Sequence, residues 1–319
     1  MTIHGVFLDA DTVDPGDLDL GGLHALPVSW VTFGTTSLDK TAARIKNATV
    51  VIVNKVMLDR QHLVGAPKLQ LVVIAATGTN NIDQSAAREL GITVCNVRNY
   101  GTPSVVQHVF ALILALTTRL PQYQNAISEG RWQRHSHFCL LDYPIRELVG
   151  RTLGILGYGA LGRGVASVAP SFGLDVVIGQ RPGAEPQAGR ISLEELLPQV
   201  DILSLHCPLT EQTQNLLSAR EFRMMKNDAV LINTARGGIV NEQALANALR
   251  AGEIGGAGID VLSEEPPAKG NPLLEPDIPN LIVTPHIAWA TRESRQRVVD
   301  IVVENIVAYL RGQPQNIVV

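Results

Sequence analysis

The chain has 319 residues, a length that favours two domains over one. Hydrophobic residues make up 45% of the chain and charged residues 18%, which supports a large core and excludes an intrinsically disordered protein. The formal net charge of -4 offers no basic surface for nucleic acid, so nucleic-acid binding is not expected.

The cysteines and the hydropathy pattern indicate a cytoplasmic protein. Cys95, Cys139 and Cys207 stand far apart. Their odd number, without metal-ligand spacing, argues for a reducing compartment and predicts no metal site. Acidic residues near the N-terminus argue against a signal peptide. The longest apolar run, residues 109–116, is too short to span a bilayer, so no membrane is expected.

Strands and helices alternate along the first hundred residues. The run 69–75 is fully apolar, as in a parallel strand covered on both faces. A short helix at 83–90 is ended by Gly91. The predicted strands are 3–8, 28–33, 50–53, 69–75 and 92–95, and a further helix is predicted at 38–46. This alternation predicts an α/β module with a parallel sheet.

A long helix is predicted from Thr102 to about residue 118, with a proline in its first turn. Its run 109–116 is apolar on all sides, so we expect the helix to be buried between two domains. Residues 131–148 are irregular and include Trp132 and Phe138. They form either an arm that packs on another subunit, as in a homodimer, or an ordinary surface loop, because aromatic residues alone do not identify an interface.

A second α/β module begins at Arg151. Its predicted strands are 175–178, 201–205, 229–232, 257–261 and 281–284. A helix at 242–250 is ended by Gly252, and a long helix at 291–310 closes the chain. The fold class is therefore α/β, with two parallel-sheet modules.

A glycine turn follows the first apolar run of this second module. The run ends in the pattern Gly157-x-Gly159-x-x-Gly162, and a helix-like segment follows. Glycines of this spacing also serve ordinary turns. In a strand–turn–helix context, however, they permit the tight turn, the approach of the backbone to a pyrophosphate, and close helix packing. The segment therefore predicts a dinucleotide-binding site.

Three charged or titratable residues follow predicted strands of the second module: Arg236, Glu265 and His286. Ligands of open parallel sheets bind outside the carboxyl ends of the strands, so all three side chains could face one site beside a nicotinamide. Each residue could also have an ordinary structural role without any part in catalysis. Arg236 could be a solvated loop arginine, Glu265 a surface acid, and His286 a core histidine bonded to the backbone.

With these segments in place, the chain resembles the NAD(P)-dependent D-isomer-specific 2-hydroxyacid dehydrogenase family over nearly its whole length. The resemblance rests on several motifs in the family's order, namely residues 157–162, 205–210 and 260–267 and the segments around Arg236 and His286. Within the family, Trp132 and residues 285–291 are most similar to glycerate dehydrogenases, also called hydroxypyruvate reductases.

The resemblance implies catalytic and substrate-binding roles. His286 would be the acid/base, Glu265 would hold the imidazole and favour its charged form, and Arg236 would bind the carboxylate and carbonyl of a small 2-oxo acid. The chemistry agrees, because an arginine fork matches such an anion and hydride addition builds negative charge on the ketone oxygen. The resemblance also implies substrate contacts from Thr77, Gly78, Lys55 and Trp289. Lys55 could equally be a solvated lysine, and Trp289 could simply pack between domains.

By the same resemblance, a further set of residues would line the cofactor: Thr102, Gly157, Tyr158, Gly159, Ala160, Leu161, Gly162, Gln180, Arg181, His206, Cys207, Pro208, Thr213, Thr234, Ala235, Arg236, Asp260 and His286. Two positions depart from the family's pattern. The strand at 175–178 should end near an acid that binds the adenosine ribose, but Gln180 and Arg181 stand there. This favours NADP(H), with NAD(H) possible. Gln107 replaces a frequent glutamate, and no function is assigned to it.

The fold that the resemblance implies has two doubly wound, Rossmann/flavodoxin-like domains with a cleft between them. Residues 1–99 plus 286–319 would form the substrate domain, and residues 100–285 the dinucleotide-binding domain. The chain would cross twice between them, which suits a hinge. Three alternatives stay open: a D-lactate-type dehydrogenase, a phosphoglycerate-type dehydrogenase, and a non-catalytic, nucleotide-sensing protein of the corepressor type.

Overall fold

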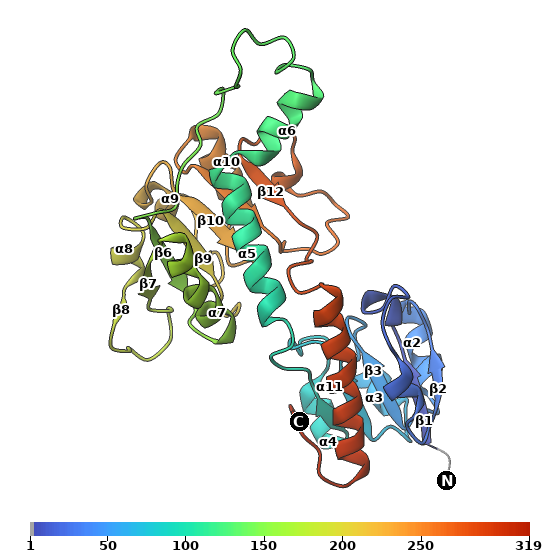
Figure 1. Ribbon diagram of the computed structural model, residues 1–319. Helices are drawn as coiled ribbons and strands as arrows, with labels where there is room; N and C mark the ends of the chain where they lie inside the picture. Colours follow the sequence, from blue (N-terminus) through green and yellow to red (C-terminus); the bar gives the residue numbers. More distant parts are fainter. Residues whose placement is uncertain (1–2) are drawn as a thin grey trace. The chain divides into compact units, whose positions relative to one another are not determined.

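The structure, a computed structural model, describes residues 3–319. The chain forms two compact units (Figure 1). The described part of the first unit is residues 3–101 together with Ala290–Val319, and the second unit is Thr102–Trp289. This division falls a few residues later than the predicted boundaries, so His286 lies in the second unit and not with residues 1–99.

The first unit is built on a five-stranded parallel sheet with the order β2-β1-β3-β4-β5. Its strands are β1 (Ile3–Phe7), β2 (Val28–Thr32), β3 (Val50–Val53), β4 (Leu71–Ile74) and β5 (Thr93–Cys95). Both central strands, β3 and β4, are buried along their whole length, with Val50 opposite Leu71. Continuous apolar runs are typical of such doubly covered strands.

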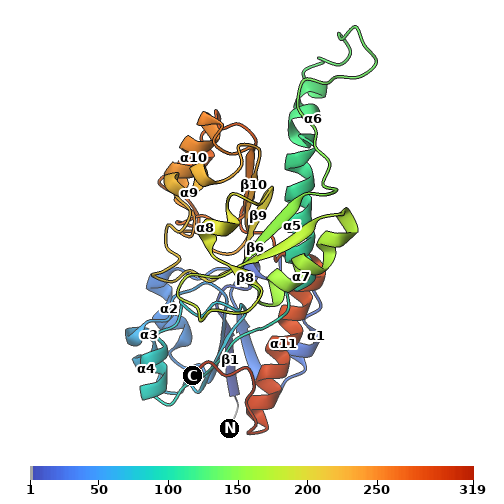
Figure 2. The ribbon, with the colours of Figure 1, turned by 90° about the vertical axis from the view of Figure 1, so that its left-hand side faces the viewer.

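Helices cover both faces of this sheet (Figure 2). On one side lie α2 (Leu38–Ile45), α3 (Arg60–Val64) and α4 (Gln84–Glu89), and on the other lie α1 (Gly21–His24) and α11 (Arg292–Leu310). Two of these helices, α3 and α4, begin at aspartates whose side chains accept a backbone N–H, an arrangement that favours a helix start. The sequence did not predict α1 or α3, because each is too short to show a helical period.

The second unit is built on a seven-stranded parallel sheet with the order β12-β11-β10-β9-β6-β7-β8. The strands are β6 (Thr152–Leu156), β7 (Asp175–Gly179), β8 (Arg190–Ile191), β9 (Ile202–Leu205), β10 (Val230–Asn233), β11 (Gly256–Ile259) and β12 (Leu281–Val283). The strand order reverses between β6 and β9, so the sheet is doubly wound and has its switch point there. The short edge strand β8 was not predicted.

Two layers of helices enclose this sheet. On one side lie α5 (Thr102–Thr117) and α7 (Ala160–Val168), and on the other lie α8 (Leu193–Leu196), α9 (Ala219–Met224) and α10 (Glu242–Ala251) (Figure 2). Within the second unit, α5 is buried along one face only. Its buried face packs on β10, β11 and α7, whereas Leu114 on the other face is 36% exposed.

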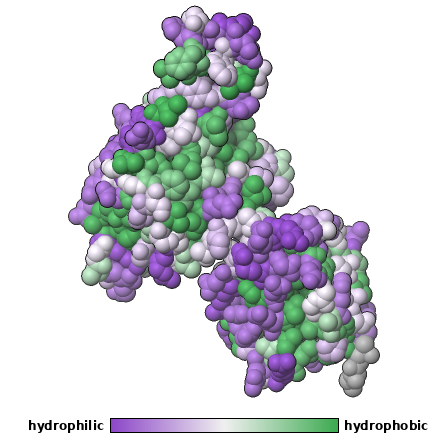
Figure 3. Space-filling view, in the orientation of Figure 1, coloured by the Kyte–Doolittle hydropathy of each residue, from purple (hydrophilic) through white to green (hydrophobic). Residues whose placement is uncertain are grey.

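The segment after α6 (Leu120–Ser128) is irregular, as expected. Phe138 is 90% exposed and Leu141 is 77% exposed. Figure 3 shows further apolar side chains on the face of the second unit that carries α5 and α6. In the described chain, no single helix is long and apolar enough to cross a membrane. The bent pair α5 and α6 passes that test together, by length and composition only.

Candidate active site

The glycine turn joins β6 to α7 and has the close contacts that require glycine. Gly157 has a φ of +101°, and a Cβ there would lie 2.5 Å from the backbone of His206 and Cys207. A Cβ on Gly162 would lie 2.1 Å from the Gly157 carbonyl oxygen. By contrast, open space surrounds the Cβ position of Gly159, which is the N-cap of α7. The start of this helix therefore leaves room for an anion at its backbone N–H groups.

Two buried polar atoms at the same edge of the sheet lack a partner among the described residues. They are Nδ1 of His206, after β9, and Oγ1 of Thr234, after β10. His206 Nε2 lies 2.8 Å from Ser204 Oγ, and burial lowers the pKa of His206 to about 4, so its ring is neutral. Buried polar groups are almost always hydrogen-bonded, and a bound dinucleotide would satisfy these two. The residues present thus fit such a cofactor.

No acidic residue directly follows β7, at the place where the family's pattern has a ribose-binding carboxylate. The Gln180 side chain instead donates hydrogen bonds to the carbonyls of Ala184 (3.1 Å) and Glu185 (3.0 Å) and holds its own loop. Arg181 comes next and is half-buried. Burial raises the pKa of Cys207 to about 11, so its thiol is protonated.

Two other predicted cofactor residues, Thr102 and Thr213, have defined contacts. Thr102, at the start of α5, faces α7, because a Cβ on Gly164 would lie 3.0 Å from its methyl group. Thr213 is fully buried, donates to the Pro208 carbonyl at 2.8 Å and accepts the Thr210 amide at 2.7 Å. Its hydroxyl therefore fixes the loop after β9.

Asp260, after β11, organises the turn that carries His286. This carboxylate is 1% exposed and accepts the Thr284 hydroxyl at 2.6 Å and the amides of Ile287 and Ala288 at 2.9 Å. The amide of His286 also donates to the Asp260 carbonyl at 2.8 Å. From the sequence, Asp260 was predicted only as a cofactor residue; its role in this turn could not be predicted, because the bonds join residues more than twenty positions apart.

His286 and Glu265 form a direct pair. The Nδ1 atom of His286 lies 2.6 Å from Oε2 of Glu265, whose Oε1 accepts the Leu262 amide at 2.9 Å. Both side chains are about one third exposed. His286 has a φ of +56°, a backbone conformation that is uncommon outside glycine and marks functional sites. Because Nδ1 is engaged by the carboxylate, Nε2 is the ring atom that can exchange a proton with a ligand.

The loop of Arg236 packs against the loop of Glu265. Asn233, at the end of β10, bonds both ends of a short turn: its side chain accepts the Ala235 amide at 3.1 Å and donates to the Arg236 carbonyl at 3.0 Å. At the next position, a Cβ on Gly237 would lie 1.9 Å from the Leu262 carbonyl oxygen. The structure thus brings together the loops of all three predicted catalytic residues within the second unit.

The predicted substrate residues of the first unit follow β3 and β4. Thr77 donates its hydroxyl to the Val97 carbonyl at 2.8 Å, and its own carbonyl accepts the Asn96 side chain at 2.8 Å. The Lys55 amide donates to the buried carboxylate of Asp9 at 2.6 Å, a partner that the sequence analysis missed. These bonds fix the backbone that leads into Gly78 and the exposed Lys55 side chain.

Trp289 is the last residue of the second unit and is half-buried. It packs against the hydrophobic cluster beneath α5 and α7. His108 of α5 was not predicted, yet its Nε2 lies 3.0 Å from the Thr284 hydroxyl and 3.6 Å from Asp260. It therefore supports the turn that carries His286.

A doubly wound sheet with a dinucleotide turn and an acid/base pair defines a nicotinamide-dependent oxidoreductase. Residues 110–288 match the family described as "D-isomer specific 2-hydroxyacid dehydrogenase, NAD binding domain". The chain is 42% identical to a glycerate dehydrogenase of Methylorubrum extorquens, over 100% of this chain and 99% of that protein. It is 38% identical to a hydroxypyruvate reductase of Blautia hydrogenotrophica, over 98% of each chain.

Among solved structures, an acyclic imino acid reductase in complex with NADPH and D-Arg aligns with a TM-score of 0.86 and 27% identity, over 99% of this chain and 100% of that one. The chain belongs to the D-isomer-specific 2-hydroxyacid dehydrogenase family. The predicted family, fold class and enzyme class are confirmed.

Proposed function

We propose that this protein reduces hydroxypyruvate or glyoxylate to the corresponding D-2-hydroxy acid, with NADPH as the preferred cofactor. The observation that carries the proposal is the 2.6 Å pair of His286 and Glu265, whose loop packs against that of Arg236. The names of the relatives, a glycerate dehydrogenase and a hydroxypyruvate reductase, support the choice of substrate.

Each residue has a defined task in this reaction. When bound, the nicotinamide supplies the hydride. Arg236 binds the substrate carboxylate through its planar fork of donors. His286 gives a proton from Nε2 to the carbonyl oxygen, and Glu265 keeps the ring oriented through Nδ1. In the first unit, Gly78 and Lys55 offer a backbone N–H and a cation to the same anionic substrate. Thr77 and Trp289 belong to the same proposed substrate set.

A panel of 2-oxo acids tests the assignment. Hydroxypyruvate, glyoxylate, pyruvate and phosphohydroxypyruvate are each assayed with NADH and with NADPH. We expect the highest kcat/KM for hydroxypyruvate or glyoxylate. A preference for pyruvate or for the phosphorylated acid would instead support a lactate-type or phosphoglycerate-type dehydrogenase. The absence of turnover with every substrate would favour a nucleotide-sensing protein.

Cofactor choice gives a separate prediction. Because β7 is followed by Gln180 and Arg181 in place of an acid, a 2′-phosphate meets a cation and no repulsion. Arg181→Ala should lower kcat/KM for NADPH about tenfold or more, the usual loss for a charge-assisted hydrogen bond, and change that for NADH less than about twofold. The same alanine substitution at Arg223, an exposed residue of α9, is the matched control. Equal losses with both cofactors, or a wild-type preference for NADH, would refute the assignment.

We also propose that the protein is a cytoplasmic homodimer and that the segment 131–148 packs on the second copy. Phe138 and Leu141 are largely exposed to solvent in the single chain, which is unfavourable for large apolar side chains. A second copy that packs on this segment would cover them. Analytical ultracentrifugation should show a dimer for the wild type and dissociation for the double variant Phe138→Ser/Leu141→Ser. Leu38→Ser, at a residue that is 62% exposed in the first unit, is the control. A wild-type monomer would contradict the proposal.

The proposed cytoplasmic location is supported by the three cysteines, which are free thiols. Cell fractionation tests the location.

A further inference from the structure

The seven-stranded sheet has a second charged region at its other edge. The cofactor residues follow the carboxyl ends of the strands. A cavity of about 100 Å³ instead lies at the amino ends of β6, β9 and β10, with residues before β11 and β12 completing its wall. A single water needs only about 10–15 Å³, so this cavity has room for a larger polar species.

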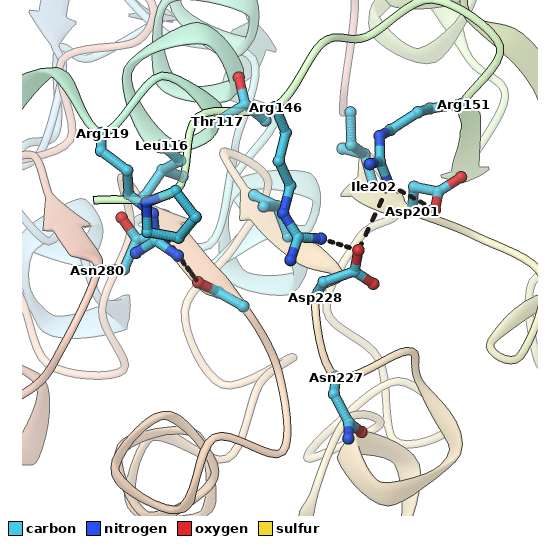
Figure 4. Close-up of a pocket in the computed structure, with 13 residues that line it drawn as sticks. Leu116, Thr117, Arg119, Arg146, Arg151, Asp201, Ile202, Asn227, Asp228 and Asn280 are labelled. Atoms are coloured by element: carbon cyan, nitrogen blue, oxygen red, sulfur yellow. Dashed lines mark hydrogen bonds and ion pairs between the residues drawn. The ribbon is translucent and has the colours of Figure 1, made fainter. Parts of the chain in front are cut away.

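The charges around the cavity do not balance. Arg151 pairs with Asp201 at 3.2 Å, and Arg146 and Arg151 both pair with Asp228 (Figure 4). Lys226, which does not line the cavity, also pairs with Asp201, at 3.0 Å. Burial alone would raise the pKa of Asp201, but the Thr152 amide and then Lys226 outweigh it and lower that pKa, so the group is ionised. Arg146 and Arg151, the two cations of this wall, are therefore matched by two carboxylates before Arg119 is considered.

Arg119 lines the opposite wall of the cavity with Asn280 (Figure 4). Among the described residues, no carboxylate lies within ion-pair distance of its guanidinium, which donates a hydrogen bond to the Gly255 carbonyl at 3.4 Å. Burial, and then the charge of Arg146, which lines the same cavity, lower the pKa of Arg119. The φ of Arg119 is +56°, a strained backbone conformation of the kind that is retained at binding sites.

We propose that this cavity binds a small tetrahedral oxyanion of the inorganic phosphate class, held by Arg119, Arg146 and Arg151. Guanidinium groups present several fixed donors and match phosphate oxygens closely. The three arginines and two aspartates that line the cavity leave one excess positive charge, which a phosphate anion would offset. The site lies at the edge of the sheet away from the glycine turn, so it is distinct from the cofactor and substrate residues and does not depend on the proposed function.

Calorimetric titration with inorganic phosphate tests the site in protein saturated with NADP(H), so that the cofactor's own phosphate positions are filled. Arg119→Gln should weaken phosphate binding about tenfold or more, as expected when a charge-assisted hydrogen bond is lost. Asn227→Asp introduces a negative charge at the rim with almost no change of shape. The Asn227 side chain is exposed and makes no hydrogen bond in the described chain, so this variant should fold normally and still weaken binding several-fold.

Arg220→Gln is the matched control, because Arg220 is 68% exposed on α9 and lines no part of the cavity. It should leave phosphate affinity within about twofold of the wild type. Chloride at the same ionic strength should give no saturable heat. The proposal is overturned if the wild type does not bind phosphate, if chloride gives the same saturable heat, or if Arg119→Gln and Asn227→Asp both bind phosphate as the wild type does.

Discussion

Replacing His286 by alanine should lower kcat by about 10²–10⁴-fold in both directions, the usual contribution of a positioned acid/base. Reduction needs a proton at the carbonyl oxygen as the hydride arrives, and oxidation needs its removal. In the structure Nδ1 is held by Glu265, so Nε2 is the atom that serves both directions. Fluorescence titration should show NADPH affinity within about twofold of the wild type, because the glycine turn and the loops after β9 and β10 are untouched.

The φ of +56° at His286 affects the design of this experiment. Alanine tolerates that conformation poorly, whereas asparagine adopts it several-fold more often than most residues. His286→Asn is therefore the cleaner variant: it removes the acid/base, keeps the turn, and should lose activity to the same extent. Retention of more than about a tenth of wild-type kcat by both variants would contradict the proposed role.

The pH dependence of the two reaction rates tests the role of Glu265. Reduction consumes a proton and oxidation releases one, so the reductive rate should fall and the oxidative rate should rise with pH. Glu265→Gln keeps the shape of the side chain but removes the charge beside Nδ1. The fall in reductive rate should then move to lower pH. An unchanged profile would mean that the pair does not act as a unit.

Arg236→Lys should lower kcat/KM for hydroxypyruvate by about 10–100-fold, although the charge is kept. The loss follows from the geometry, because a lysine is a point charge and cannot offer two parallel donors to a carboxylate. Cofactor affinity should stay within about twofold. Arg236→Gln, which also removes the charge, should lose more than the lysine variant.

The measurement is steady-state kinetics with NADPH held at saturation. If the substitution mainly raises KM, Arg236 binds the substrate and the transition state equally. If it mainly lowers kcat, Arg236 acts in the transition state. If Arg236→Lys turns over hydroxypyruvate like the wild type, Arg236 is not the carboxylate-binding residue.

Most of the fold could be predicted from the sequence because its signals are local. The buried strands β3 and β4 are continuous apolar runs, and the turn after β6 carries its glycines in the strand–turn–helix order. The prediction failed where a signal was too short or depended on distant packing. The two-residue strand β8 has no period to detect, and the exposed positions of α5 within 109–116 are Ala111 and Leu114, so no polar side chain marks the exposed face of this run.

The site was predictable only as positions after strands. Arg236, Glu265 and His286 could be selected because each follows a predicted strand, but the sequence contains no sign of the bonds that align them. Asp260 serves the His286 turn with both carboxylate oxygens, and His108 reaches the same turn from α5. These partners are far apart in the chain, so only the three-dimensional structure shows them.

The contact between Gly237 and the Leu262 carbonyl has a consequence for redesign. The backbones at Gly237 and Leu262 are in contact, and any residue larger than glycine at position 237 would force them apart. The loop of the arginine and the loop of Glu265 therefore cannot move independently. A change that shifts one loop to accept a bulkier substrate also shifts the other. New substrate specificity is therefore best sought at residues outside these loops, where side chains can change without moving the proton donor.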